Sequence, residues 1–127
     1  MALAGAVLMR AGGMELDPTT EFFQELEARG HEPGLEKVTG TLRFDLRNGK
    51  RTARWLVAIE KGEIDVSHKN TRADCVVRVD KTIFDGIAAG EVNAFAATLR
   101  GLIDIEGNPE LLVFFQRLFP APPRSGS

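Results

Sequence analysis

The sequence predicts a single α+β domain, in which a five-stranded, largely antiparallel sheet is covered on one face by helices. Two observations support this fold. The middle of the chain alternates apolar with polar residues, and tight turns join its first three such segments, which is typical of a meander of half-buried strands. The flanking segments have helical spacing with one apolar face, and that face must be buried against the sheet. A chain of 127 residues is long enough for one such core.

The first predicted helix covers residues 17–30. Asp17 and Pro18 are favourable at a helix N-terminus, and Gly30 can end the helix. Three apolar residues share one face of this helix: Phe22, Phe23 and Leu26.

Three predicted strands follow, over residues 38–47, 52–60 and 63–68. In the first, the even-numbered positions form an apolar face and the odd-numbered positions a polar one. Asn48-Gly49 is a strong hairpin signal because both residues tolerate positive φ. The second segment is apolar on both faces and is expected inside the sheet, and Lys61-Gly62 forms the next tight turn.

The second half of the chain predicts two more strands, at residues 73–80 and 101–107. Between them lie a helix over residues 80–90, with Asp80 as its N-cap, and a short helical piece over residues 93–99. Asn108 then caps a final helix that has Pro109 in its first position.

We assign the folded domain to residues 17–119. Residues 1–16 are expected to form a poorly structured N-terminal extension. Residues 120–127 are rich in proline and serine and are expected to form a flexible tail.

Charge and composition disfavour several functions. A net charge of −2 argues against nucleic-acid binding and against polybasic docking on an anionic membrane, so we expect at most transient membrane contact. No apolar run approaches the roughly 18 residues that a bilayer-spanning helix needs. The single cysteine cannot form an intramolecular disulfide, which favours a reducing, cytoplasmic location.

The sequence contains no recognisable catalytic, metal or cofactor site. It has no glycine-rich phosphate loop, no Cys-x-x-Cys pair and no His-Glu-x-x-His pattern. Cys75 shares a strand face with valines and is expected to be a buried hydrophobe rather than a nucleophile. Ser67 and His68 are adjacent on a strand, so their side chains point to opposite faces. Three strand aspartates are expected to be solvated and without an acid–base partner: Asp45, Asp74 and Asp104.

The last helix is unusually broad in its apolar surface. On a helical wheel its apolar side chains span an arc of about 160°, wider than the roughly 100° that packing on one neighbour requires. The pattern fits either a core helix or one wall of a ligand cavity. The residues in this arc are Leu111, Leu112, Phe114, Phe115, Leu118 and Phe119.

Four segments, in order and spacing, resemble the sterol carrier protein 2 family. They are "GTLRFDLRNG", "ARWLVAIEKGE", "RADCVVRVD" and "GLIDIEGNPELL". The resemblance covers roughly residues 20–119. It implies a five-stranded sheet with helices on one side and a hydrophobic tunnel between them.

The resemblance also implies a function. Members of this family are non-enzymatic carriers of sterols, fatty acids, fatty acyl-CoAs or phospholipids, without metal or cofactor, and the last helix would form one wall of the tunnel. We expect a monomer or weak dimer that binds such a lipid. The expected lipid-binding residues are Phe84, Ile87, Phe95, Leu99, Ile103, Ile105, Leu111, Phe114, Phe115 and Leu118.

Two departures from the family pattern matter for the ligand. The family strand commonly reads Gly-Lys-Leu-Lys-Ile, whereas Leu102 and Asp104 occupy the lysine positions here, so ligand uptake is expected to depend little on ionic strength. Asn93-Ala94 replaces the family's Asn-Pro. Two alternatives stay open: an accessory domain whose apolar groove binds a partner protein or a second copy, and a small thioester hydrolase relying on Cys75 and His68.

Overall fold

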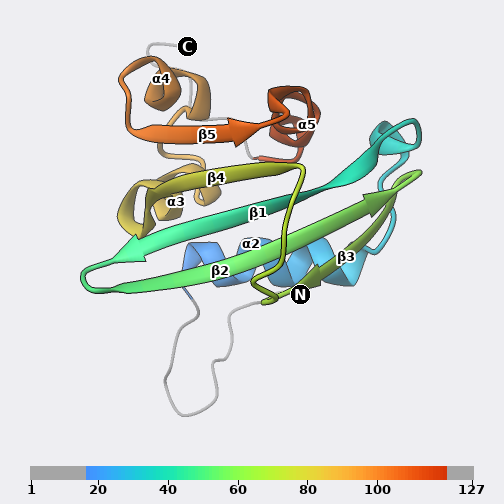
Figure 1. Cartoon of the computed structure of the whole chain (residues 1–127), viewed down its shortest axis with the longest axis horizontal. Helices are drawn as coiled ribbons and strands as arrows, with labels where there is room; N and C mark the ends of the chain where they lie inside the picture. The colour runs from blue at the N-terminus through green and yellow to red at the C-terminus, as the bar shows by residue number, and fades with distance from the viewer. Residues whose placement is uncertain (1–16, 120–127) are drawn as a thin grey trace, which may run out of the picture.

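The structure, a computed structural model, describes residues 17–119, which form one sheet layer and one helix layer (Figure 1). The predictions for residues 1–16 and 120–127 lie outside the described residues. The elements are, in chain order, α2 (Pro18–Arg29), a 3₁₀ turn η2 (Pro33–Leu35), β1 (Thr39–Asn48), β2 (Arg51–Glu60), β3 (Glu63–Ser67), β4 (Cys75–Asp80), α3 (Lys81–Ala88), α4 (Ala94–Leu99), β5 (Ile103–Gly107), α5 (Pro109–Phe115) and a 3₁₀ turn η3 (Gln116–Leu118).

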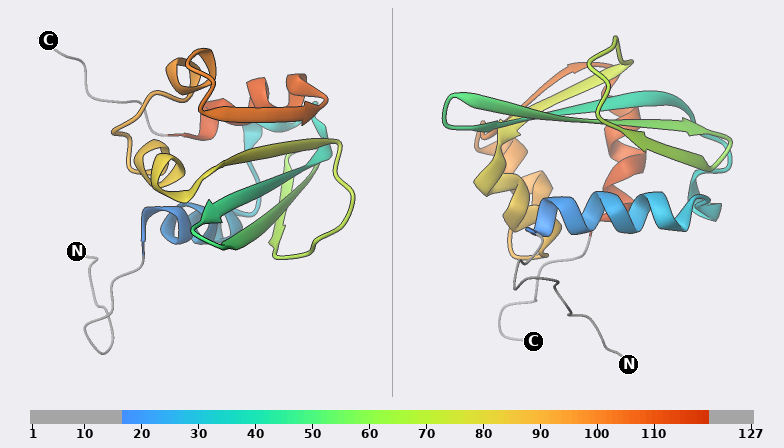
Figure 2. Two further views of the ribbon diagram at one scale, coloured as in Figure 1. Left: turned by 60° about the vertical axis from the view of Figure 1, so that its left-hand side comes forward. Right: turned by 90° about the horizontal axis from the view of Figure 1, so that it is seen from below.

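The five strands form one sheet in the order β3-β2-β1-β4-β5. The pairs β1–β2, β2–β3 and β4–β5 are antiparallel, and only β1–β4 is parallel. The predicted fold class is therefore confirmed. The helices lie on one side of this sheet, as the view from below makes clear (Figure 2).

The helix layer begins as the sequence predicts. The Asp17 carboxylate accepts a hydrogen bond of 2.7 Å from the backbone N–H of Thr20, and Gly30 ends α2 in the left-handed conformation at φ 69°. Lys81, at the start of α3, lies 2.8 Å from Asp17 and 3.0 Å from Asp85. Burial alone raises the pKa of Asp17, but the hydrogen bonds from Lys81 and Thr20 outweigh it and lower that pKa. This ion cluster joins α2 to α3.

Asp74 joins β1, β4 and α5. Its carboxylate accepts a hydrogen bond of 3.0 Å from the Thr41 N–H, and its carbonyl accepts one of 2.8 Å from the Asn108 N–H. Gly107 has φ 97°, and a Cβ there would lie within van der Waals overlap of the Asp74 carbonyl oxygen. Asp74 is exposed, as expected, yet it holds the start of β4 against the β5–α5 corner.

The prediction that Asp45 is solvated was wrong. It is 6% exposed, on the sheet face opposite the helices. Arg43 donates two hydrogen bonds to its carboxylate, of 2.8 and 3.0 Å, and Arg54 lies 3.6 Å away. Arg43 also donates to the carbonyl of Thr71, in the loop that crosses from β3 to β4. That loop and the arginine side chains cover a position that strand alternation alone places in water.

Two local details also differ from expectation. Asp80 occupies the N-cap position of α3, but its side chain makes no capping hydrogen bond and instead accepts one of 3.1 Å from Arg47. The last helix does not run through residue 119, because α5 ends at Phe115 and tightens into η3.

Candidate functional site

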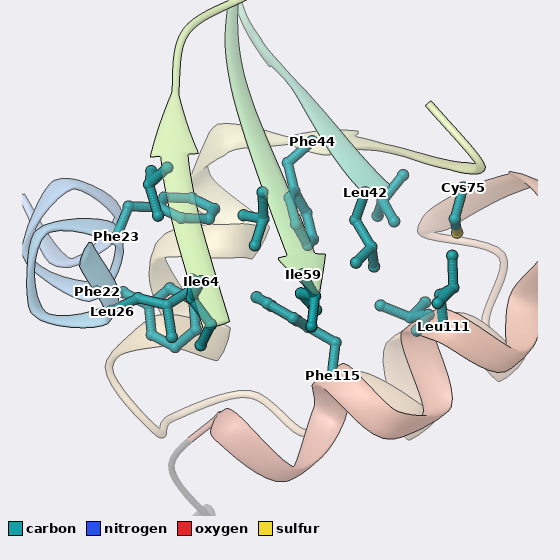
Figure 3. Packing of buried hydrophobic residues seen from close by; sticks show 14 of the residues in the cluster. Phe22, Phe23, Leu26, Leu42, Phe44, Ile59, Ile64, Cys75, Leu111 and Phe115 are labelled. Carbon is teal, nitrogen blue, oxygen red and sulfur yellow. The ribbon is translucent and has the colours of Figure 1, made fainter. Parts of the chain in front are cut away.

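The inner face of the sheet and the helices enclose an apolar layer rich in phenylalanine (Figure 3). Phe23 of α2 stacks on Trp55 at 4.6 Å and on Phe84 at 5.6 Å between ring centroids. Phe115 of α5 is fully buried, and its ring centroid lies 5.2 Å from that of Phe44 on β1. Aromatic rings from the helices therefore pack directly against aromatic rings from the strands in this layer.

Helix α5 approaches the sheet closely at Gly40. A Cβ at Gly40 would lie 2.8 Å from a methyl group of Leu111, so the absence of a side chain there lets the helix dock. Figure 3 shows Leu111 and Phe115 pointing from α5 toward the strands. The position opposite them, Val113, is 59% exposed.

One small cavity lies between the sheet and helices α3, α4 and α5. Its volume is ≈ 10 Å³, close to that of a single water site, whereas pockets for small molecules measure about 300–1,000 Å³. This cavity is therefore closed in this conformation. The cavity is lined by Phe44, Val77, Val79, Phe84, Ile87, Ala94, Thr98, Ile103, Leu112, Gln116 and Phe119.

The cavity lining has no charged side chain. Of its two polar members, Thr98 donates its hydroxyl proton to the Ala94 carbonyl at 2.9 Å and is thereby satisfied within α4. Gln116 supplies the other polar group. Such a lining suits an apolar molecule and offers no general acid, base or metal ligand. Among the described residues, no group of three or more histidine, cysteine or acidic side chains is placed to hold a metal ion.

The structure distributes the expected lipid-binding residues over three environments. Phe84, Ile87 and Ile103 line the cavity. The second group packs in or against the core beyond the lining: Ile105, Leu111, Phe114, Phe115 and Leu118. Phe95 and Leu99 are 63% and 72% exposed, on the outer side of α4.

Sequence reasoning left out eight of the lining residues. Phe44, Val77 and Val79 belong to the alternating inner faces of β1 and β4, and that alternation is the signal by which they could have been found. Leu112 and Phe119 belong to the broad apolar arc of the last helix, which is their signal in the sequence. Nothing in the sequence marks the remaining three, because their position depends on how the helices are placed: Ala94, Thr98 and Gln116.

Two larger grooves are open to solvent and carry carboxylates. One, of ≈ 430 Å³, runs along α2 and α3 and includes Glu21 and Glu25. The other, of ≈ 520 Å³, lies at the end of the sheet beside Glu63 and Asp65. Their charged rims fit an apolar ligand less well than the cavity does.

The residues of the hydrolase alternative lie in unsuitable environments. Cys75 is fully buried, and burial raises the pKa of its thiol, which disfavours the nucleophilic thiolate. His68 donates to the Arg54 carbonyl at 2.9 Å through Nδ1, and its ring lies 4.1 Å from the Trp55 ring centroid. Both interactions assign His68 to local packing at the end of β3.

Within residues 17–119, no helix combines the length and apolarity that crossing a bilayer demands.

Comparison of this chain with known proteins identifies one protein family. The model of the SCP-2 sterol transfer family matches residues 13–120. The hydroxysteroid dehydrogenase-like protein 2 of Xenopus laevis is 23% identical over 111 residues, which are 86% of this chain and 26% of that protein. The chain thus spans about a quarter of the length of the curated relatives it matches.

Two solved structures share the fold. Palmitated SCP2L2 from Aedes aegypti superposes with a TM-score of 0.66 at 17% identity, over 87% of this chain and 100% of that one. The sterol carrier protein domain 2 of Helicoverpa armigera gives 0.65 at 23% identity, over 87% and 91%. Together with the sheet order, the single helix layer and the match over residues 13–120, these findings show that the chain belongs to the SCP-2 sterol transfer family.

Proposed function

We propose that this protein binds one long-chain or sterol-like lipid between its sheet and helices α3, α4 and α5, and carries it without chemical change. The observation that supports this most directly is the uncharged cavity at that place. Family membership supports lipid binding in general, and a relative of the same fold is described with palmitate. The acid–base and metal groups that catalysis requires are missing from the lining.

A cavity of ≈ 10 Å³ must enlarge before a lipid can enter. Of the three helices around the cavity, α4 has the fewest buried residues, since only Ala97 is buried there. Elements with few buried apolar contacts open at the lowest free-energy cost. We therefore assign the entry of ligand to an outward movement of α4, which would expose the cavity beside Ala94 and Thr98.

The lining chemistry favours a ligand that is mainly apolar and has one uncharged or hydrogen-bonding head. An acyl-CoA would leave its phosphates outside the cavity, because no cationic side chain lines it. A sterol-like alcohol, or a fatty acid whose carboxylate also stays outside the cavity, matches this lining more closely.

Two tryptophan substitutions in α4 test the proposal. Ala94 lines the cavity, whereas Ala96, two residues along the same helix, is exposed. Ala94→Trp should place an indole in the path of the ligand and weaken palmitate binding about tenfold or more, while Ala96→Trp should bind like the wild type. Affinity is measured by displacement of a fluorescent fatty acid, and folding by circular dichroism.

Native mass spectrometry of the purified protein adds an independent readout. A co-purified lipid mass in the wild type that is lost in Ala94→Trp supports the proposal. Wild-type protein that neither carries lipid nor takes up palmitate or a sterol would contradict it.

A further inference from the structure

The two edges of the sheet differ in how their backbone is covered. Along β3, the N–H of Ile64 donates to the Gly30 carbonyl at 2.8 Å, and His31 forms a bridge with Glu63. At the other edge, β5 pairs with β4 alone within residues 17–119. Alternate backbone N–H and C=O groups of β5 therefore point away from the sheet, where they are available to a further strand.

The outer face of the sheet, opposite the helices, carries a row of charges that alternates in sign from strand to strand. The register places Arg54 of β2 opposite Asp45 of β1, and Asp45 opposite Arg78 of β4. Arg78 is in turn opposite Asp104 of β5, so the row ends at the edge on a carboxylate. Cross-strand pairs of opposite charge stabilise a sheet, whereas like charges destabilise it. A further strand would therefore fit best with a cation opposite Asp104.

Glu106 adds a second carboxylate on the same face of β5. Arg78 lies 3.5 Å from Asp104 and 3.0 Å from Glu106, and among the described residues it is the only cation at ion-pair distance from either. One guanidinium thus serves two carboxylates, whose side chains are still 75% and 67% exposed. The edge therefore keeps a net negative charge that is accessible from the side away from β4.

The other exposed charges near β5 do not cancel this negative charge. Asp80, at the end of β4, lies 3.1 Å from Arg47. Glu91 and Arg100 flank α4 in sequence, and Glu110 lies in the first turn of α5. These five residues carry three negative and two positive charges, so the surroundings are also slightly acidic. The cations of the β1–β2 turn lie on the far side of β4 from this edge.

The inner face of β5 is apolar. Ile103 and Ile105 are half-buried and pack against the core, at the edge of the apolar layer. Helix α4 lies at the start of β5 and reaches past it in Figure 1 and in the left view of Figure 2. This helix exposes Phe95 and Leu99, which are one helical turn apart. A strand added to β5 would therefore have apolar groups on its inner side and carboxylates on its outer side.

A second copy of this chain fits the edge poorly. Antiparallel pairing of two β5 strands centred on Ile105 would place Asp104 of one copy opposite Glu106 of the other. Centring on Asp104 or on Glu106 would place identical carboxylates opposite each other, and like charges in such pairs are destabilising. The same carboxylates would repel a nucleic acid or an anionic membrane. The edge therefore favours a cationic strand from a different protein.

We propose that β5 accepts an extended segment of another protein as a further strand of the sheet. The segment alternates lysine or arginine with apolar residues. Its cations face Asp104 and Glu106, and its apolar side chains lie on the inner side, next to Ile103 and Ile105. Main-chain hydrogen bonds supply affinity in this mode of binding, and alternate side chains supply specificity. The inference goes beyond lipid carriage and does not depend on it.

The test uses a synthetic peptide of about seven residues in which lysine alternates with valine, long enough to span β5. Its binding to the full chain is measured by fluorescence anisotropy at low salt. Asp104→Asn with Glu106→Gln, the edge variant, should weaken binding about tenfold, at roughly threefold for each exposed charge pair. Glu60→Gln with Asp65→Asn is the matched control, because both carboxylates are exposed on the same face of the sheet, toward its other edge. The control should bind as the wild type does.

Two further comparisons separate strand pairing from general attraction between charges. Asp104→Lys with Glu106→Lys should prefer a peptide in which glutamate alternates with valine. The lysine peptide N-methylated throughout keeps its charge but has no backbone N–H, so it should bind the wild type about tenfold more weakly or worse. Hydrogen exchange of the β5 amides should slow when the unmethylated peptide binds.

The outcomes decide between this docking mode and its alternatives. Binding that is weakened in the edge variant and kept in the control pair supports the proposal. Wild-type protein that does not bind the lysine peptide at low salt overturns it, as does equal weakening by the control pair or undiminished binding of the N-methylated peptide. A wild-type dimer that is lost in the edge variant also overturns it, because the edge would then pair with a second copy. Palmitate uptake should be the same in the wild type and the edge variant, so failure of lipid carriage leaves this proposal standing.

Discussion

Leu111 and Leu112 are adjacent on α5 and nearly equally buried, at 6% and 5% exposure, but only Leu112 borders the cavity. Replacing each by alanine is therefore a matched pair of core truncations. Each removes three carbon groups, which costs about 2.4 kcal/mol at about 0.8 kcal/mol per group. Space that does not collapse adds about 1 kcal/mol for every ~40 Å³ left empty. Both variants should lose about 2.5–5 kcal/mol of unfolding free energy.

The two variants should differ once ligand is added. Leu112→Ala enlarges the cavity in which we place the lipid, so palmitate should fill the new space and restore part of the lost stability. In Leu111→Ala the empty space lies against Gly40, outside the cavity lining. Palmitate should therefore stabilise this variant no more than it stabilises the wild type. A ligand present at 100 times its Kd stabilises a protein by about 2.7 kcal/mol, which a shift of the denaturation midpoint resolves.

The assay is urea unfolding of each variant with and without saturating palmitate, together with displacement of a fluorescent fatty acid. Equal restoration of both variants would refute the assignment of the cavity as the lipid site. A loss below about 1 kcal/mol in both would refute the packing of α5 against the sheet.

Three further predictions concern packing and charge. Leu111→Trp should cost about 1–3 kcal/mol of unfolding free energy, because Leu111 is buried and already packs closely against Gly40, and unchanged thermal stability would instead indicate open space at this helix. Asp45→Ala should cost about 1.5–3 kcal/mol by removing the hydrogen bonds that Arg43 donates, and an unfolding midpoint like that of the wild type would show that the arginine cluster contributes nothing. His31 binds Glu36 and Glu63, and both hydrogen bonds raise its pKa above the ordinary 6.5. Its contribution to stability is therefore complete below pH 6.5 and lost as pH rises through the raised pKa, so His31→Gln should flatten the stability profile across that range.

The elements with local signals could be predicted from the sequence. Asp17, Pro18 and Gly30 bound α2, and the Asn48-Gly49 turn fixes the β1–β2 hairpin, because each of these residues acts on its own neighbours. The parallel pairing of β1 with β4 had no such signal. It depends on a loop, residues 68–74, whose sequence does not reveal which edge of the sheet it reaches.

The candidate site was harder to predict for a related reason. Periodicity identifies the apolar face of a helix but does not say that this face is buried, and on α4 the apolar pair Phe95 and Leu99 points outward. The small residues Ala94 and Thr98 face the cavity instead. The burial of Asp45 likewise depends on a distant loop, on Arg43 of its own strand, and on Arg54 and Arg78 of the two neighbouring strands.

Cys75 is the only thiol in the chain and lies fully inside the structure, on the strand that faces Leu111 of α5 (Figure 3). A thiol reagent cannot reach it until β4 and α5 separate, so the alkylation rate reports how often that separation occurs. The alkylation rate of Cys75 at low denaturant therefore measures how often the native protein opens. Mass spectrometry follows it, because each alkylated molecule gains the mass of one reagent group. A bound lipid that holds β4 and α5 together should lower the alkylation rate of Cys75, and one that pushes them apart should raise it.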